Sequence, residues 1–273
     1  MITSSSDSSV ERISSGNEQI DLILGGGFPA NSVNVIMGLP GTGKTILVEQ
    51  LLFHNATSER PALYLTTLSE PLAKVIRYLQ NFSFFDESKL GDAVQYEDIG
   101  ERLNQEGVEA LLARVREALL DRPPSILVID SFKVLHDLEP SARLLRRLTH
   151  ELAALLSACD TTAFLLGEYT DAHIATLAEF SVADSIVQLS RNASNRRDER
   201  FIRVHKLRGS GYREGIHSFR IGSGGLEVFP RLVSPRTPDD YRAVVEKLSV
   251  GTPGLDELMG GGVERGSCTV VMG

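Results

Sequence analysis

Residues 32–55 read SVNVIMGLPGTGKTILVEQLLFHN, and this stretch decides the fold. The apolar run at 32–37 predicts a buried strand, and the apolar spacing over 45–55 predicts a helix. Between them, residues 38–45 fit G-x-x-x-x-G-K-[ST], the pattern of a phosphate-binding loop that joins a strand to a helix. The stretch therefore predicts an α/β domain that binds a nucleotide phosphate group.

Each type of residue in this loop contributes to the binding of phosphate or of its metal ion. Glycines let backbone N–H groups approach phosphate oxygens closely, and the N-terminus of the following helix favours negative charge. Lys44 supplies a cation for the β- and γ-phosphates, and the Thr45 hydroxyl is a candidate Mg²⁺ ligand. The residues expected to bind the nucleotide here are Gly38, Leu39, Pro40, Gly41, Thr42, Gly43, Lys44 and Thr45.

Beyond the loop, apolar strand-like runs alternate with helical patterns. The expected strands are 62–66, 94–96, 125–130 and 162–166, and the expected helices run from 69–71 to 79, over 108–120 and over 141–158. This alternation predicts a mostly parallel central sheet flanked by helices on both faces. From residue 185 onward, short segments separated by turn-like loops predict antiparallel hairpins at one edge of the sheet.

Two carboxylates are expected near the loop, because ligands of such sheets bind beyond the carboxyl ends of the strands. Asp130 ends the strand SILVID and is a candidate to hold Mg²⁺, although a turn or helix-capping aspartate is the alternative. Glu168 follows the strand at 162–166 and is a second acidic candidate, for which a structural ion pair is the slightly preferred interpretation.

The beginning of the chain recurs near its end. Residues 12–38 align with residues 247–273 without a gap, at an offset of 235 positions (247 − 12). The matches include Ser14 with Ser249, Gly16 with Gly251, Asp21 with Asp256, and the glycine triplets 25–27 and 260–262. The repeat predicts a tandem protein. We expect a disordered leader at 1–11, a first domain at 12–229, a linker at 230–246 and the truncated start of a second domain at 247–273.

The composition limits the classes of partner and the cellular location that we expect for this chain. The net charge of −8 gives no electrostatic reason to bind nucleic acid or an anionic membrane. Two cysteines in unrelated contexts favour a reducing compartment. We find no apolar run of membrane-spanning length and no apolar signal core, so the expected location is cytoplasmic.

Lys206-Leu207-Arg208-Gly209 is expected to follow an edge strand and lies in a basic stretch, which leaves three interpretations open. The first is a solvated hairpin. The second is a nucleic-acid surface, which the interleaved Asp198 and Glu199 disfavour. The third is a set of cations that is offered to the nucleotide of a neighbouring subunit.

Several motifs together resemble the KaiC family of RecA-like ATPases. They are S-x-G-x-x-x-x-D-x-[IL]-[LM]-G-G-G at 14–27 and 249–262, GLPGTGKT, the strand ILVIDS, and KLRGSGYREG at 206–215. The resemblance implies a RecA-like P-loop NTPase fold, a homo-hexameric ring of double-domain subunits, and ATP with Mg²⁺ bound between subunits. It implies that Lys206, Leu207 and Arg208 bind the neighbour's nucleotide, with the two cations reaching its phosphates.

The resemblance also implies slow ATP hydrolysis for conformational signalling, regulatory protein partners, and serine/threonine autokinase activity in the second domain. Family members usually carry a Glu-Glu pair after the second strand, whereas Leu68-Ser69 stands here. Either the nearby Glu70 orients the attacking water, or hydrolysis is weak, with Glu168 as a further candidate. Two alternatives remain open: a RecA- or RadA-like DNA-dependent recombination ATPase, and a nucleotide-gated scaffold without catalysis.

Overall fold

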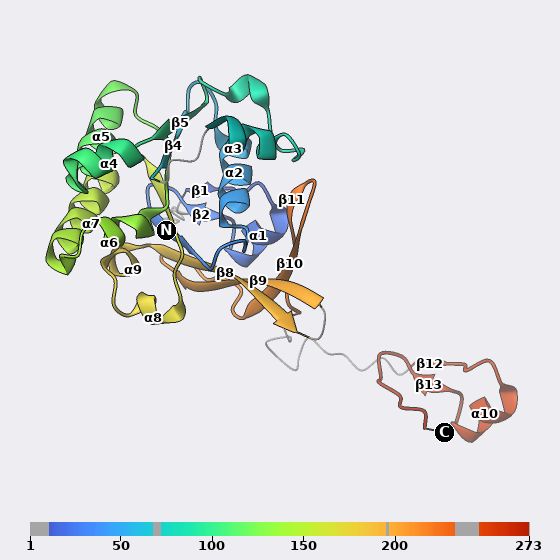
Figure 1. Ribbon diagram of the computed structural model, residues 1–273. Helices are drawn as coiled ribbons and strands as arrows, with labels where there is room; N and C mark the ends of the chain where they lie inside the picture. Colours follow the sequence, from blue (N-terminus) through green and yellow to red (C-terminus); the bar gives the residue numbers. More distant parts are fainter. Residues whose placement is uncertain (1–10, 68–71, 195–196, 233–245, 273) are drawn as a thin grey trace, which may run out of the picture. The chain divides into compact units, whose positions relative to one another are not determined.

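The computed structural model describes residues 11–67, 72–194, 197–232 and 246–272. These residues belong to two compact units that divide between Arg231 and Leu232 (Figure 1). The expected leader, apart from Glu11, and nearly all of the expected linker lie outside the described residues. Within the described parts of the chain, no helix is both long enough and apolar enough to cross a membrane.

The first unit contains the strands of the main sheet and the helices that cover it. Its elements are β1 (Arg12–Ile13), α1 (Glu18–Ile23), β2 (Phe28–Pro29), β3 (Val33–Met37), α2 (Lys44–Asn55), β4 (Ala62–Thr66), α3 (Leu72–Leu79), the 3₁₀ turn η1 (Glu87–Lys89), β5 (Val94–Asp98), α4 (Gly100–Glu106), α5 (Glu109–Asp121), β6 (Ile126–Asp130), the 3₁₀ turn η2 (Phe132–Val134), α6 (Leu135–Leu138), α7 (Ala142–Ser157), β7 (Thr162–Gly167), α8 (Asp171–Ile174), α9 (Ala178–Val182), β8 (Ser185–Ser194), β9 (Arg197–Leu207), β10 (Ile216–Gly222) and β11 (Gly225–Phe229).

Nine strands form the central sheet in the order β11-β10-β9-β8-β3-β7-β6-β4-β5. Every neighbouring pair from β8 to β5 is parallel, and the pairs β8–β9, β9–β10 and β10–β11 are antiparallel. The predicted α/β class, with a mostly parallel sheet and antiparallel hairpins at one edge, is therefore confirmed.

The sheet is buried on both faces because its strands are apolar on both. In β3, Val33, Val35 and Met37 face one core, whereas Ile36 faces the other. Helices α4, α5 and α7 cover one face and α1, α2 and α3 lie on the opposite side (Figure 1). Helix α2 contributes Leu47 and Leu51, both fully buried, so the helix that follows the phosphate-binding loop is anchored in the core.

Three details differ from the sequence-based expectations. Strand β5 extends to Asp98, and helices α4, α6, α8 and α9 were not predicted. The last three are only four or five residues long, too short for a periodic pattern to show. The basic stretch was placed after an edge strand, and this was wrong: β9 lies inside the sheet, between β8 and β10.

The described part of the second unit contains β12 (Lys247–Leu248), α10 (Pro253–Leu258) and β13 (Val263–Glu264). Strands β12 and β13 pair antiparallel, as β1 and β2 do in the first unit. The sequence repeat is therefore also a repeat of local structure.

Candidate functional site

The phosphate-binding loop runs from the end of β3 to the start of α2. Gly38 has a positive φ, and a Cβ there would collide with the carbonyl oxygen of Leu189, so the position needs glycine. Gly43 is left-handed and stands directly before α2, which begins at Lys44 with no side-chain cap. The first backbone N–H groups of α2 are therefore free of side-chain acceptors at the point where a phosphate would bind.

Lys44 lies near the end of the loop, as the first residue of α2, and is largely buried. Its Nζ donates to the carbonyl oxygens of Gly38 at 2.9 Å and of Leu39 at 3.2 Å. Burial lowers the pKa of Lys44, while the charges of Asp130 and Glu168 oppose that shift. The three residues that were expected to converge at the carboxyl ends of the strands thus act electrostatically on one another.

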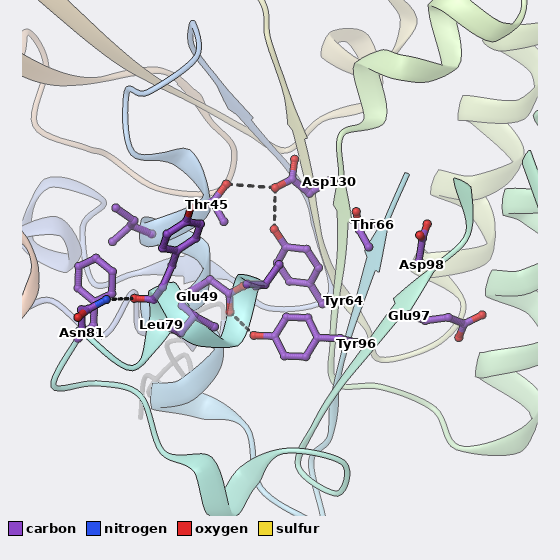
Figure 2. A pocket seen from close by; sticks show the side chains of 14 residues that line it. Thr45, Glu49, Tyr64, Thr66, Leu79, Asn81, Tyr96, Glu97, Asp98 and Asp130 are labelled. Atoms are coloured by element: carbon purple, nitrogen blue, oxygen red, sulfur yellow. Dashed lines mark hydrogen bonds between the residues drawn. The ribbon is translucent and has the colours of Figure 1, made fainter. Parts of the chain in front are cut away.

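Thr45 and Asp130 form the candidate magnesium site. The Thr45 hydroxyl donates to Asp130 Oδ2 at 3.2 Å, although the two residues are 85 positions apart (Figure 2). A second donor reaches the same oxygen, because Tyr64 Oη lies 2.6 Å away. A hydroxyl and a carboxylate are the hard oxygen ligands that Mg²⁺ prefers, so these two residues fit the metal.

A cavity of about 610 Å³ opens beside this cluster, between α2, α3 and strands β4 to β6. Thr45, Tyr64 and Asp130 line it together with Glu49 and Tyr96 (Figure 2). Glu49 is fully buried; its Oε2 accepts from the Tyr96 hydroxyl, and among the described residues Oε1 has no hydrogen-bond partner. Burial raises the pKa of Glu49 to about 8, which favours the protonated form of the carboxyl at neutral pH.

Two further acidic residues line this cavity, Glu97 and Asp98, which are the last two residues of strand β5. Glu97 forms an ion pair with Arg114, whose Nη2 lies 2.7 Å from Glu97 Oε2. Asp98 accepts a 2.8 Å hydrogen bond from the backbone N–H of Gly100. Asp98 and Asp130 both pair with Thr66 in the sheet register, so their side chains share one face. Sequence reasoning missed Asp98, although its place at a strand end is the signal that identified Asp130.

The expected catalytic carboxylates have different outcomes. Glu70 lies outside the described residues. Glu168 is exposed just after β7, and within the described ranges it forms no ion pair. The structural ion pair that was the slightly preferred interpretation of Glu168 is therefore not seen among those residues.

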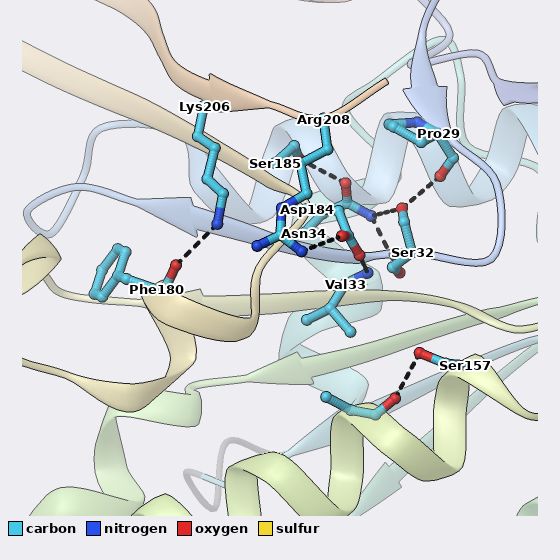
Figure 3. Close-up of polar contacts among 11 residues, drawn as sticks. Pro29, Ser32, Val33, Asn34, Ser157, Phe180, Asp184, Ser185, Lys206 and Arg208 are labelled. Atoms are coloured by element: carbon cyan, nitrogen blue, oxygen red, sulfur yellow. Dashed lines mark hydrogen bonds and ion pairs between the residues drawn. The ribbon is translucent and has the colours of Figure 1, made fainter. Parts of the chain in front are cut away.

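Lys206 and Arg208 lie level with the amino ends of the parallel strands, whereas the loop lies at their carboxyl ends. Ser185 pairs with both Asn34 of β3 and Leu207 of β9, so β9 ends beside the start of β3. Arg208 Nη1 lies 3.4 Å from Asp184 Oδ1, and Lys206 Nζ lies 3.4 Å from the carbonyl of Phe180 (Figure 3). The structure thus brings Lys44, Thr45, Asp130 and Glu168 together and separates Lys206, Leu207 and Arg208 from them.

Asp184 connects Arg208 to the sheet through hydrogen bonds. Its Oδ2 accepts from the backbone N–H of Val33 at 3.0 Å, and its backbone carbonyl accepts from the N–H of Arg208 at 2.9 Å. Burial lowers the pKa of Lys206, the charge of Arg208 adds to this effect, and Asp184 opposes it. The Arg208 side chain stays 59% exposed, so its guanidinium is available to a second molecule.

The fold and the loop define an α/β protein of the phosphate-loop class. The model of the KaiC ATPase family matches residues 13–233, and the chain belongs to this family of ATPases. Among curated proteins, the circadian clock oscillator protein KaiC of Picosynechococcus sp. is 29% identical over 276 residues, which cover 97% of this chain and 52% of the relative.

Two further relatives show the same coverage. The circadian clock oscillator protein KaiC of Rippkaea orientalis is 27% identical over 99% of this chain and 53% of its own length. The circadian clock oscillator protein KaiC 1 of Synechocystis sp. is also 27% identical, over 97% of this chain and 52% of its own length. The chain therefore spans about half the length of the curated relatives that it matches.

Proposed function

We propose that the first unit binds Mg·ATP through the loop 38–45 and hydrolyses it slowly. Lys44 meets the β- and γ-phosphates, and Thr45 with Asp130 holds the metal ion. The contact between Thr45 and Asp130 supports this assignment, because it joins the start of α2 to the end of β6 at the loop. The metal ion would supply charge neutralisation on the transferred phosphoryl group.

The nucleotide sits between subunits of a homo-oligomeric ring, which we propose to be a hexamer. The observation that carries this step is the separation of the two cationic sites. Strand β3 is five residues long, about 15 Å, and stands between the loop at its carboxyl end and Arg208 at its amino end. Lys206 and Arg208 therefore serve a neighbour's phosphates, and Leu207 accompanies them at that contact.

Mixing two inactive variants tests this assignment. Lys44→Ala lacks its own phosphate cation but keeps the cations that it offers to a neighbour. Arg208→Ala has the reverse defect and is expected to keep ATP binding. A cation supplied across an interface contributes about 10³–10⁵ in rate. Each variant alone is expected to be nearly inactive, and the mixture to recover measurable ATPase activity.

The assembly state is the control for this experiment. Both variants are to be shown by analytical ultracentrifugation to form the same oligomer as the wild type. A mixture that stays inactive, although both variants assemble, contradicts the trans assignment. Wild-type activity is also expected to rise more than linearly with protein concentration until the rings are complete.

Slow turnover would support conformational signalling to regulatory protein partners rather than metabolic flux. Any serine/threonine autokinase activity is proposed for the second domain of a full-length protein. The absent Glu-Glu pair favours a second candidate, a scaffold whose rings assemble with ATP but do not consume it. A ring that forms with ATP and shows no phosphate release above background would favour the scaffold.

The water-orienting carboxylate separates these two candidates further. If Glu70 takes the role, Glu70→Gln is expected to slow phosphate release and leave ATP binding unchanged. If turnover is robust and Glu70→Gln leaves it untouched, the same substitution at Glu168 becomes the decisive variant. Phosphate release by single-turnover kinetics, with nucleotide affinity measured in parallel, distinguishes the outcomes.

A further inference from the structure

Tyr64 is a buried residue whose side-chain hydroxyl points at the candidate magnesium site. Strand β4 lies between β5 and β6, and Tyr64 pairs with Val128, two residues before Asp130. Because side chains two positions apart share a face of a strand, Tyr64 and Asp130 lie on the same side of the sheet. The Tyr64 side chain is almost fully buried, and its hydroxyl donates to Asp130 Oδ2 at 2.6 Å (Figure 2).

The two hydrogen bonds to Asp130 leave its carboxylate oriented. Thr45 and Tyr64 both donate to Oδ2, while Oδ1 receives no hydrogen bond from any described side chain. A phenol hydroxyl donates a single hydrogen bond, and that of Tyr64 is directed to this one oxygen of the Asp130 carboxylate.

A second layer holds the Tyr64 ring in place. The ring centroids of Tyr64 and Tyr96 lie 5.2 Å apart, and the Tyr96 hydroxyl donates to Glu49 on α2. Glu49 stands one helical turn after Thr45, so the same helix carries a metal ligand and the support beneath it.

We propose that Tyr64 is a positioning residue of the magnesium site: its hydroxyl fixes Asp130 through Oδ2, so that Oδ1 is presented to the metal ion and its water. The proposal rests on the function given above. Tyr64 touches neither nucleotide nor metal and acts through the carboxylate. A tyrosine that only filled the core would contribute to stability but not to the effect of Mg²⁺ on nucleotide binding.

The test compares nucleotide affinity with and without the metal. The affinity for a fluorescent, non-hydrolysable ATP analogue is measured in saturating Mg²⁺ and in EDTA, and the ratio of the two affinities is the magnesium gain. In Tyr64→Phe, we expect this gain to fall about tenfold, because the variant lacks one hydrogen bond to a charged group. The affinity in EDTA is expected to stay within about twofold of the wild type, since the loop is untouched.

Tyr169 provides a matched control. It is fully buried, and its hydroxyl donates to a different carboxylate, Glu179, at 2.7 Å. Tyr169→Phe therefore removes an equivalent hydrogen bond away from Asp130 and is expected to keep the wild-type magnesium gain. An unchanged gain in Tyr64→Phe, or an equal loss in both variants, overturns the positioning role.

A second measurement covers the case in which Tyr64→Phe does not fold. Addition of Mg²⁺ to the wild-type complex with the analogue is expected to change the tyrosine ultraviolet difference spectrum, and Asp130→Asn is expected to abolish the change. A wild-type protein that binds Mg·nucleotide without this spectral change contradicts the inference about Tyr64 alone. A wild-type protein with no magnesium gain at all contradicts the proposed function as well.

Discussion

The motif at residues 12–29 and its copy at residues 247–264 share their central hydrogen bonds but differ in burial. Ser14 Oγ donates to Asp21 at 2.6 Å, and Gly26 N–H donates to the Asp21 carbonyl at 2.7 Å. In the copy, the Ser249 hydroxyl donates to Asp256, and Gly261 N–H donates to the Asp256 carbonyl at 2.7 Å. The offset of 235 positions therefore maps these two hydrogen bonds onto each other.

The glycine triplets show the same equivalence in the backbone. Gly27 has φ +114° and Gly262 has φ +110°. A Cβ on Gly27 would collide with the carbonyl oxygen of Ile13, and one on Gly262 with that of Leu248, which is the equivalent residue. Glycine is thus required twice by one local turn.

Burial is what differs between the copies. Ile20 and Ile23 are fully buried in the first unit, whereas their counterparts Leu255 and Leu258 are 45% and 86% exposed. The comparison teaches that polar side chains and glycines determine the shape of this motif locally. In the first copy, Ile20 and Ile23 also pack into the core of the first unit, which contributes to the stability of the motif there.

The largest expected difference between the two units concerns nucleotide binding. Lys44 belongs to the loop that follows the first copy, and the described part of the second unit contains no such loop. Lys44→Ala is expected to abolish ATP binding by the first unit, because no other cation of the loop is positioned at the phosphates. Equilibrium binding of labelled ATP measures this, and unchanged affinity would disprove the assigned site.

The next largest effect concerns the apolar pair Ile23 and Leu258. Ile23→Ala leaves a cavity in a close-packed core and is expected to lower the free energy of unfolding by about 2–5 kcal/mol. Leu258→Ala removes a side chain that already faces solvent, so the expected change is within about 0.5 kcal/mol. Urea unfolding of both variants measures the difference, and equal costs would mean that Leu258 is buried in solution.

A smaller effect is expected for the aspartates that organise the two copies. Asp21 accepts hydrogen bonds from Ser14 and from both the N–H and the hydroxyl of Ser15. Asp21→Ala is expected to lower the free energy of unfolding by about 2 kcal/mol, because buried donors lose a charged acceptor.

Asp256→Ala is the matched variant in the second copy. It is expected to leave the main unfolding transition unchanged and to alter only the local signals of residues 247–264, which amide hydrogen exchange can resolve. A shift of the main transition in Asp256→Ala would show that the second copy stabilises the first unit, contrary to this prediction.

Much of the fold and part of the site could be predicted because their signals are local. The strand-loop-helix order over residues 32–55 and the apolar run before Asp130 are contiguous patterns, and they correspond to β3 with α2 and to β6. Lys44 and Thr45 follow from the motif itself. Asp130 needed one further rule, that the carboxyl ends of parallel strands meet at one edge.

The remaining parts of the site depend on contacts between distant residues. Tyr64 reaches Asp130 across 66 positions and Glu49 reaches Tyr96 across 47, so periodicity shows only that these positions are buried. Arg208 lies at the end of the strands away from the loop because β8 pairs with β3, an arrangement that short-range patterns do not encode. An acidic residue within the apolar run of α2 was the available signal for Glu49.

The smallest effect that we expect is a pH dependence of stability that belongs to the first unit alone. Glu49 lies in α2, beyond the part of the first unit that residues 247–264 repeat. Burial raises its pKa to about 8 from an ordinary value of 4.5. Between these values the folded protein holds a proton that the unfolded chain has released, so the free energy of unfolding falls as pH rises.

Glu49→Gln carries a neutral amide of similar shape and is expected to remove this contribution. Glu49 contributes a slope of at most about 1.4 kcal/mol per pH unit to the free energy of unfolding. This slope should vanish above the pKa of Glu49 in the folded protein and below its pKa in the unfolded chain. Urea unfolding at pH 6 and pH 7 is expected to show a fall in the wild type that is about 1 kcal/mol larger than in Glu49→Gln. The exposed Glu59→Gln is the control and should behave as the wild type. Parallel pH profiles for the wild type and Glu49→Gln would mean that the Glu49 carboxyl is ionised in the folded protein.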